Sequence, residues 1–124
     1  MDSISRGPTY FREREVGWCS VGENVGVEIN GKGDQFTRPI LILRKLDSYS
    51  FIGLPLTTAK RIGSWYTDLK IKNKESTIIL SQARHFDYRR MSDRMCTVSE
   101  DDFKRIRARF IGLITGTNMP PASD

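Results

Sequence analysis

Two apolar runs separated by three residues constrain the fold of this chain most strongly. The runs are Arg38–Leu46 and Ser50–Leu56, and the residues between them are Asp47-Ser48-Tyr49. Short apolar runs joined by a few polar, turn-forming residues predict a β-hairpin. Pro39 has to lie at the start of its strand or on a sheet edge, because proline has no N–H to donate to a ladder.

Further short strands and one helix are predicted around this hairpin. The strands are Glu15–Val21, Trp65–Lys72, Ser76–Ser81 and Met95–Val98. The helix begins after Ser99, which can cap it, and Asp102 can close a capping box. Its apolar stripe is Phe103, Ile106, Phe110, Leu113 and Ile114, and Gly116 is expected to end it. We therefore expect a mainly β fold with a C-terminal α-helix, built on a small curled or barrel-like antiparallel sheet.

The length of 124 residues suits a single domain spanning 1–124. Residues 1–13 are expected to form a loose N-terminal arm, and residues 117–124 a frayed tail. Between the first two strands, Gly22–Thr37 is rich in glycine and lacks apolar periodicity. Loops of this length inside a compact domain tend to be functional or disordered.

The composition favours a polyanionic partner. Lys and Arg total 20 against 15 Asp and Glu, so the net charge is +5. No apolar run approaches the roughly 20 residues of a membrane span, and no secretory signal is recognisable, so we expect a cytoplasmic protein without a membrane partner. Two cysteines and one histidine do not suffice for a structural zinc site, and we expect no metal and no cofactor.

Arg38 and Thr57 are candidates for phosphodiester chemistry. A guanidinium stays cationic and can grip two oxygens at once, and a hydroxyl can hold a third. Antiparallel pairing in the hairpin would bring Arg38 and Thr57 close together. Taken alone, Arg38 is more simply explained as an arginine at a strand edge, and Thr57 as a threonine that ends a strand. The loop that follows adds Thr58, Lys60 and Arg61 as candidate phosphate contacts.

A third candidate segment combines arginines with aromatic residues, the chemistry that binds single-stranded RNA. Its candidate binding residues are Gln82, Arg84, His85, Asp87 and Arg90. An internal salt-bridge network, in which Asp87 neutralises an arginine, is an equally good interpretation. We expect His85 to be a structural or binding residue rather than a catalytic acid or base, because its neighbouring arginines disfavour the charged imidazole.

Glu28 lies in the glycine-rich loop, where it could accept a proton if ligand binding desolvated it and raised its pKa. An exposed surface glutamate or an arginine partner is the alternative.

Three segments in this order resemble the MazF/PemK family of bacterial toxins over roughly residues 14–115. The segments are Val25-Gly26-Val27-Glu28 with Arg38-Pro39-Ile40-Leu41-Ile42, then Pro55-Leu56-Thr57-Thr58, then Leu80-Ser81-Gln82-Ala83-Arg84 with Asp87 and Arg90. The resemblance implies an SH3-like small β-barrel, the MazF/PemK/CcdB-like toxin fold, assembled as a homodimer in the bacterial cytoplasm. It also implies metal-independent, sequence-selective cleavage of single-stranded mRNA to a 2′,3′-cyclic phosphate, and inhibition by a cognate antitoxin. Arg38 and Thr57 would be the catalytic pair, with Glu28 at the same centre.

Three positions depart from the family pattern. Ser81 replaces an acidic residue of several members, and Ile79 and Val27 replace an arginine and a histidine of one subgroup, so that subgroup's proton-transfer roles cannot be transferred. A non-catalytic RNA-binding module is the alternative function, as is a gyrase poison of the same fold. The gyrase poisons act through a C-terminal aromatic tip, which the ending Met-Pro-Pro-Ala-Ser-Asp lacks. A structural subunit of a larger complex, with the basic surface as its interface, is a third possibility.

Overall fold

The computed structural model describes residues 11–21 and 37–116. These residues form seven strands, two short 3₁₀-helices and one long α-helix. In chain order the elements are β1 (Glu15–Ser20), β2 (Thr37–Lys45), β3 (Ser50–Thr57), β4 (Tyr66–Ile71), β5 (Lys74–Ile79), η4 (Leu80–Gln82), β6 (Arg84–Asp87), η5 (Tyr88–Arg90), β7 (Met91–Thr97) and α2 (Glu100–Thr115).

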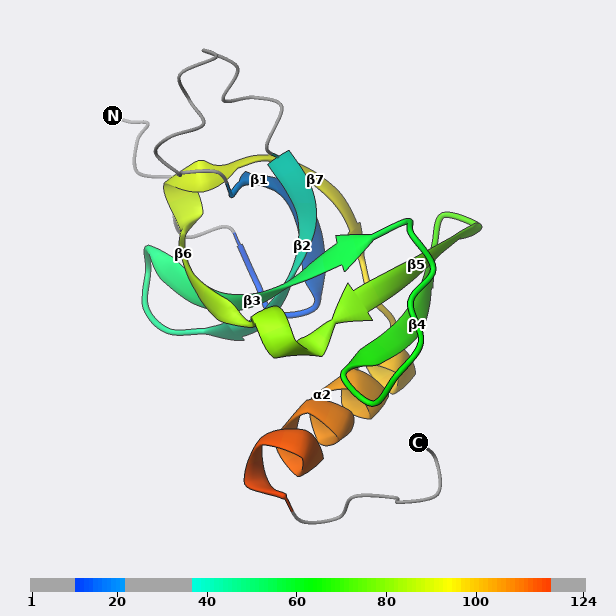
Figure 1. Cartoon of the computed structure of the whole chain (residues 1–124). Helices are drawn as coiled ribbons and strands as arrows, with labels where there is room; N and C mark the ends of the chain where they lie inside the picture. Colours follow the sequence, from blue (N-terminus) through cyan, green and yellow to red (C-terminus); the bar gives the residue numbers. More distant parts are fainter. Residues whose placement is uncertain (1–10, 22–36, 117–124) are drawn as a thin grey trace, which may run out of the picture.

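All strands belong to one antiparallel sheet. Its order is β4-β5-β3-β2-β1-β7, and β6 pairs separately with β3. In Figure 1 the sheet curls into a half-barrel, while the β4–β5 hairpin extends away from it and lies beside α2. The expectation of a mainly β, barrel-like fold with a C-terminal helix is confirmed.

The central strands are apolar on both faces because each face covers a separate core. Successive side chains of a strand point to opposite faces, so Ile40 and Ile42 pack with Phe11, Phe51 and Phe86 inside the curl. We call this the inner face. The opposite, outer face carries Val16, Leu41, Leu43, Leu54 and Leu56, which pack against the β4–β5 hairpin and against Phe103 and Ile106 of α2.

The β2–β3 hairpin is not paired along its whole length. Its ladder runs from Lys45–Phe51 to Ile40–Pro55. Beyond Pro55, β3 pairs with β5 through Leu56–Ile78 and Thr57–Thr77, whereas β2 stays with β1. The two strands therefore part at the end of the hairpin that holds Arg38 and Thr57, and we call this gap the fork.

The helix boundaries follow the capping residues. The Ser99 hydroxyl accepts a hydrogen bond from the Asp102 amide at 3.1 Å, and Gly116 adopts the left-handed conformation with φ 75°. In the predicted capping box the Asp102 side chain would bond back to the Ser99 amide. Instead its carboxylate pairs with Arg105 at 3.2 Å. Ile114 is 57% exposed, so the predicted apolar stripe is wrong at its last position.

Other boundaries also differ from the prediction. The last strand begins at Met91 rather than Met95, and β6 was not predicted. Phe11 is fully buried against Phe51 and Tyr88, so the loose arm does not extend to residue 13. The expectations for residues 1–10, 117–124 and most of the glycine-rich loop, Glu28 included, lie outside the described residues.

Candidate functional site

Arg38 and Thr57 stand on the two tips of the fork. Arg38 is exposed and lies opposite Cys19 of β1, whereas Thr57 is half-buried and lies opposite Thr77 of β5. By strand alternation Arg38 belongs with Ile40 and Thr57 with Phe51, so both share the inner face. The β2–β3 ladder stops two residues short of each, and the meeting of their side chains stays a prediction.

The Thr57 hydroxyl is held in place by the backbone that follows it. Its Oγ1 accepts a hydrogen bond from the Ala59 amide at 3.1 Å. A hydroxyl that accepts one bond keeps its own hydrogen to donate. The Thr57 O–H is thus available to a negatively charged oxygen in the fork.

A largely apolar hollow of about 290 Å³ opens on the outer face of the fork. Its floor is made by the buried Leu56 and Ile71, and its wall by Trp18 and Pro39. The remaining lining residues are Thr58, Lys72, Lys74, Ser76 and Met95. Because Trp18, Pro39 and Leu56 alternate with Cys19, Arg38 and Thr57, this hollow lies on the other side of the sheet from the candidate pair.

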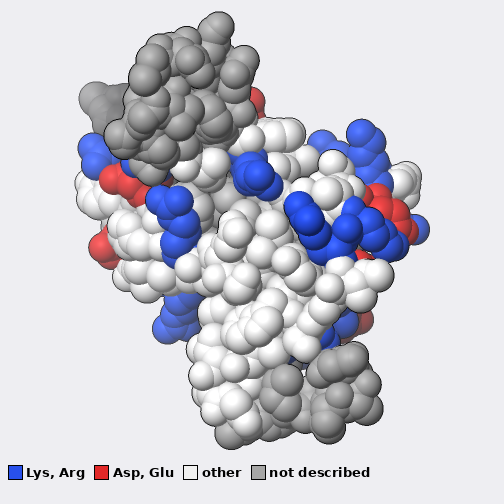
Figure 2. All heavy atoms as spheres, in the orientation of Figure 1, with Lys and Arg blue, Asp and Glu red and all other residues white. Residues whose placement is uncertain are grey.

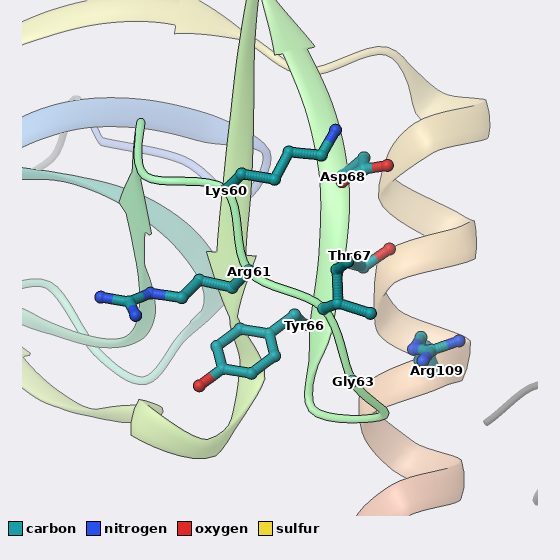
Figure 3. A pocket seen from close by; sticks show the side chains of 8 residues that line it. Lys60, Arg61, Gly63, Tyr66, Thr67, Asp68 and Arg109 are labelled. Atoms are coloured by element: carbon teal, nitrogen blue, oxygen red, sulfur yellow. The ribbon is translucent and has the colours of Figure 1, made fainter.

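A second hollow, also about 290 Å³, lies between the β3–β4 loop and α2 (Figure 3). Lys60, Arg61 and Arg109 line it, together with Tyr66 and Asp68. The Arg109 guanidinium donates to the Ser64 carbonyl at 2.9 and 3.3 Å, which ties the loop to the helix. Arg105 similarly donates to the Thr67 hydroxyl at 2.9 Å and to the Asp68 carbonyl at 3.0 Å.

The predicted cations of this loop do not converge. In Figure 3, Lys60 extends toward Asp68, while Arg61 extends to the opposite side, above the Tyr66 ring. Lys60, Arg61 and Thr58 are all exposed. The loop therefore offers separate positive charges along the surface after Thr57 rather than one compact anion site.

The third candidate segment pairs with the middle of β3. His85 lies opposite Ile52 and Arg84 opposite Gly53. Ile52 precedes Thr57 by five residues, which is about 16 Å along an extended strand. Arg84, His85 and Gln82 are exposed, and the Arg84 guanidinium lies 5.1 Å from the centre of the Phe86 ring. Within one chain, Arg84 and His85 thus lie away from Thr57 along β3, whereas Arg90 contacts the end of β1 that pairs with β2 next to Arg38.

For Asp87 the structure supports the salt-bridge interpretation. Its carboxylate accepts bonds from the Arg89 amide at 2.8 Å and from the Arg89 guanidinium at 2.8 and 3.0 Å. These hydrogen bonds and the positive charge of Arg89 lower the pKa of Asp87 to about 2. Arg90 donates to the Ser20 carbonyl at 3.3 Å, which links η5 to the end of β1.

Both cysteines are free. Burial raises the pKa of the Cys19 thiol to about 12, and it also raises that of the half-buried Cys96. Within residues 11–21 and 37–116, no three His, Cys, Asp or Glu side chains gather as a metal site would require. No helix in these ranges is both long and apolar enough to span a membrane.

The charged side chains are unevenly distributed over the face seen in Figure 2. Lys and Arg gather there with acidic residues on the side of the β4–β5 hairpin, and the middle of this face is mostly uncharged. Lys72 lies in the turn at the tip of that hairpin, and Lys74 is the first residue of β5 after it. Sequence reasoning missed these two lysines and Trp18, because only the pairing of β1 and the fold-back of the hairpin bring them to the fork.

Residues 12–114 match the sequence model of one protein family, the PemK-like, MazF-like toxins of type II toxin–antitoxin systems. Two solved structures share the fold. The Mycobacterium tuberculosis toxin MazF-mt6 has a TM-score of 0.62 at 14% identity, over 86% of this chain and 100% of that chain. An endoribonuclease in complex with its cognate antitoxin from Mycobacterial species has a TM-score of 0.64 at 13% identity, over 87% and 97%. No match was found among curated protein sequences.

Proposed function

This chain belongs to the family of PemK-like, MazF-like toxins of type II toxin–antitoxin systems, and we propose that it is a metal-independent endoribonuclease acting on single-stranded mRNA in the bacterial cytoplasm. The observation that carries the proposal is the placement of Arg38 and Thr57 on the same face at the two tips of the fork. A structural relative named as an endoribonuclease lends further support. The reaction is attack of a ribose 2′-hydroxyl on the adjacent phosphorus, with release of the 5′-oxygen and formation of a 2′,3′-cyclic phosphate.

Arg38 supplies the permanent positive charge that this reaction requires. The phosphorane carries one more negative charge than the diester, and a guanidinium can pair with two of its oxygens. Arg38 is exposed on a strand that is paired with β1, so its backbone is fixed while its head reaches the solvent. The Thr57 O–H donates to a third oxygen, oriented by the bond from Ala59.

The proton of the attacking hydroxyl goes to Glu28 in this proposal, and the departing 5′-oxygen takes a proton from water to leave as a 5′-hydroxyl. A carboxylate desolvated by bound RNA gains basicity, because the loss of water disfavours its charged form. His85 is not used as the proton acceptor, since its position opposite Ile52 is about 16 Å along β3 from Thr57. Thr58, Lys60 and Arg61 contact the RNA on one side of the fork, and Gln82, Arg84, His85 and Arg90 extend the contact surface.

The proposal includes two protein partners. The relative in complex with its cognate antitoxin supports inhibition of this chain by an antitoxin of its own. An acidic antitoxin would suit the net charge of +5. We also propose a homodimer, in which the surface of β6 and η5 on one subunit adds to the RNA path of the other.

The test is incubation of purified protein with single-stranded RNA in the presence of a chelator, with the product ends identified by mass spectrometry. We expect 2′,3′-cyclic phosphate and 5′-hydroxyl ends for the wild type, and a loss of nearly all product for Arg38→Ala. Arg44→Ala is the matched control, because Arg44 is an exposed arginine of the same strand, away from the fork. Intact RNA with folded wild-type protein would refute the proposal, and tight binding unaffected by Arg38→Ala would favour the non-catalytic RNA-binding alternative.

A further inference from the structure

We propose that the hollow on the outer face of the fork binds one base of the RNA strand and so determines part of the sequence preference. This inference rests on the proposed function, because it assigns a second site to the same substrate. The hollow is defined by Trp18, Pro39, Leu56 and Ile71, with two lysines and two hydroxyls at its rim.

The size and lining of the hollow suit a single planar base. Its volume of about 290 Å³ lies just below the range of roughly 300–1,000 Å³ that holds whole small-molecule ligands. Its floor is core, since Leu56 is 1% exposed and Ile71 6% exposed. A base transferred from water to this site therefore meets apolar surface on its broad face and a limited opening at its edge.

Trp18 provides the stacking surface. It lies opposite Pro39 in the β1–β2 ladder and opposite Asp93 in the β1–β7 ladder, so strands on both sides fix its backbone. Its side chain is nevertheless 37% exposed. Met95 lines the same hollow from β7, at a register shift that leaves it without a partner in the β1–β7 ladder. An aromatic ring held by rigid backbone loses little entropy when a base stacks on it.

The rim carries the polar groups that an RNA ligand needs. Lys72 and Asn73 both have positive φ, 51° and 67°, and form the tight turn between β4 and β5, which Lys74 follows directly. Lysines at this position pair with the phosphates that flank a bound base. The hydroxyls of Thr58 and Ser76 can donate to or accept from a base edge.

The fork connects this hollow to the proposed site of cleavage. Thr58 lines the hollow and follows Thr57 directly, and Pro39 lines it and follows Arg38 directly. Because the β2–β3 ladder ends at Ile40–Pro55, no strand pairing closes the gap between these tips. A phosphate held by Arg38 and Thr57 on the inner face can therefore have its neighbouring base in the hollow on the outer face.

Trp18 fluorescence gives a readout that does not depend on cleavage. The chain has two tryptophans, so Trp65→Phe leaves Trp18 as the only one. The probe is a single-stranded RNA methylated at every 2′-oxygen, which cannot be cut. We expect it to quench Trp18, and an RNA lacking one base at the occupied position to quench it much less.

Affinity for the same probe, measured by fluorescence polarisation, tests the stacking contribution. Trp18→Leu keeps an apolar side chain but removes the ring, and we expect about 5- to 150-fold weaker binding. Trp18→Phe should restore most of the affinity. Tyr49→Leu is the matched control, because Tyr49 is an exposed aromatic residue at the other end of the β2–β3 hairpin, and it should bind as the wild type does.

Unquenched Trp18 together with equal affinity of Trp18→Leu and the wild type would overturn the inference, even if the protein cuts RNA. If the wild type cuts no RNA but the probe quenches Trp18, the hollow binds a base while the proposed catalysis is wrong. An acidic peptide, Asp-Glu-Leu-Phe-Glu-Asp, is the competing ligand. Quenching by this peptide and not by the RNA would assign the hollow to a protein partner and overturn the inference.

Discussion

Ile40 of β2 and Pro55 of β3 are the last paired positions of their ladder, and beyond them the two strands part to different neighbours. The sheet thereby gains an open end without exposing a long edge, since each strand continues to pair on its other side. Arg38 and Thr57 stand at this opening on one face, and an apolar hollow lies on the other. Both proposed RNA contacts depend on this single departure from regular pairing.

Removal of the Thr57 hydroxyl should reduce turnover more than binding. We expect Thr57→Val to lower kcat by roughly 10²-fold, the order seen when one donor to a developing oxyanion is lost, and Thr57→Ser to retain most activity. Kinetics on an oligonucleotide with one ribose at the cleavage site measure this effect. A larger rise in KM than fall in kcat would argue against a role in the transition state.

The bond between Arg109 and the Ser64 carbonyl should control the loop that carries Lys60 and Arg61. Arg109→Met removes both contacts to this carbonyl, and hydrogen bonds from a charged group contribute about 1.5–3 kcal/mol. We expect a lower free energy of unfolding in urea and a several-fold higher KM for RNA with kcat unchanged. Arg107→Met, on the exposed side of the same helix, should leave KM as it is. Equal KM values for the two variants would count against this role of the loop.

Asp87 should contribute to stability rather than to RNA binding, because its carboxylate is already paired with Arg89. Its pKa is lowered from 3.8 to about 2, so the contribution is present above pH 4 and is lost as the pH falls toward 2. The pair is largely exposed, and we expect Asp87→Asn to lower the free energy of unfolding by no more than about 1 kcal/mol at pH 7. Chemical denaturation at pH 7 and pH 2 measures the difference, which should be much smaller at the lower pH. A tenfold loss of RNA affinity in this variant would show instead that Asp87 touches the substrate.

Gly53 allows β6 to close over β3. A Cβ atom at this position would lie 3.0 Å from Cδ2 of Phe86 and closer still to the Ile40 side chain. Overpacking of this kind costs about 1–3 kcal/mol, so Gly53→Ala should lower the thermal midpoint by several degrees. Calorimetry against Lys70→Ala, at an exposed position of β4, separates this crowding from the general effect of an alanine in a strand. An unchanged midpoint for Gly53→Ala would mean that β6 does not pack as closely as described.

Local pattern was enough to predict the elements that hold the candidate site. The β2–β3 hairpin followed from two apolar runs and a polar turn, and α2 from the cap at Ser99 and the stop at Gly116. The strand β6 escaped detection because only Phe86 of its four residues is buried, which leaves too little alternation to recognise.

The fork and its hollow could not be predicted in the same way. They arise where β3 stops pairing with β2 and pairs with β5 instead, and this pairing joins segments about 20 residues apart in the sequence, which no local pattern announces. Trp18 gave no separate signal for the same reason, since its exposure is set by the strands beside it. Arg38 and Thr57 could be named from chemistry, but the gap between them could not.

The most direct test of the account is a double-mutant cycle on kcat with Arg38→Ala, Thr57→Val and the combined variant, on one RNA with a chelator present. Two groups that act on the same phosphate lose their effect together, so the combined variant should cut scarcely more slowly than Arg38→Ala alone. A shared site at the fork would be contradicted if the combined variant lost the product of the two single fold-losses in kcat. A single variant that cuts RNA as fast as the wild type would contradict it as well.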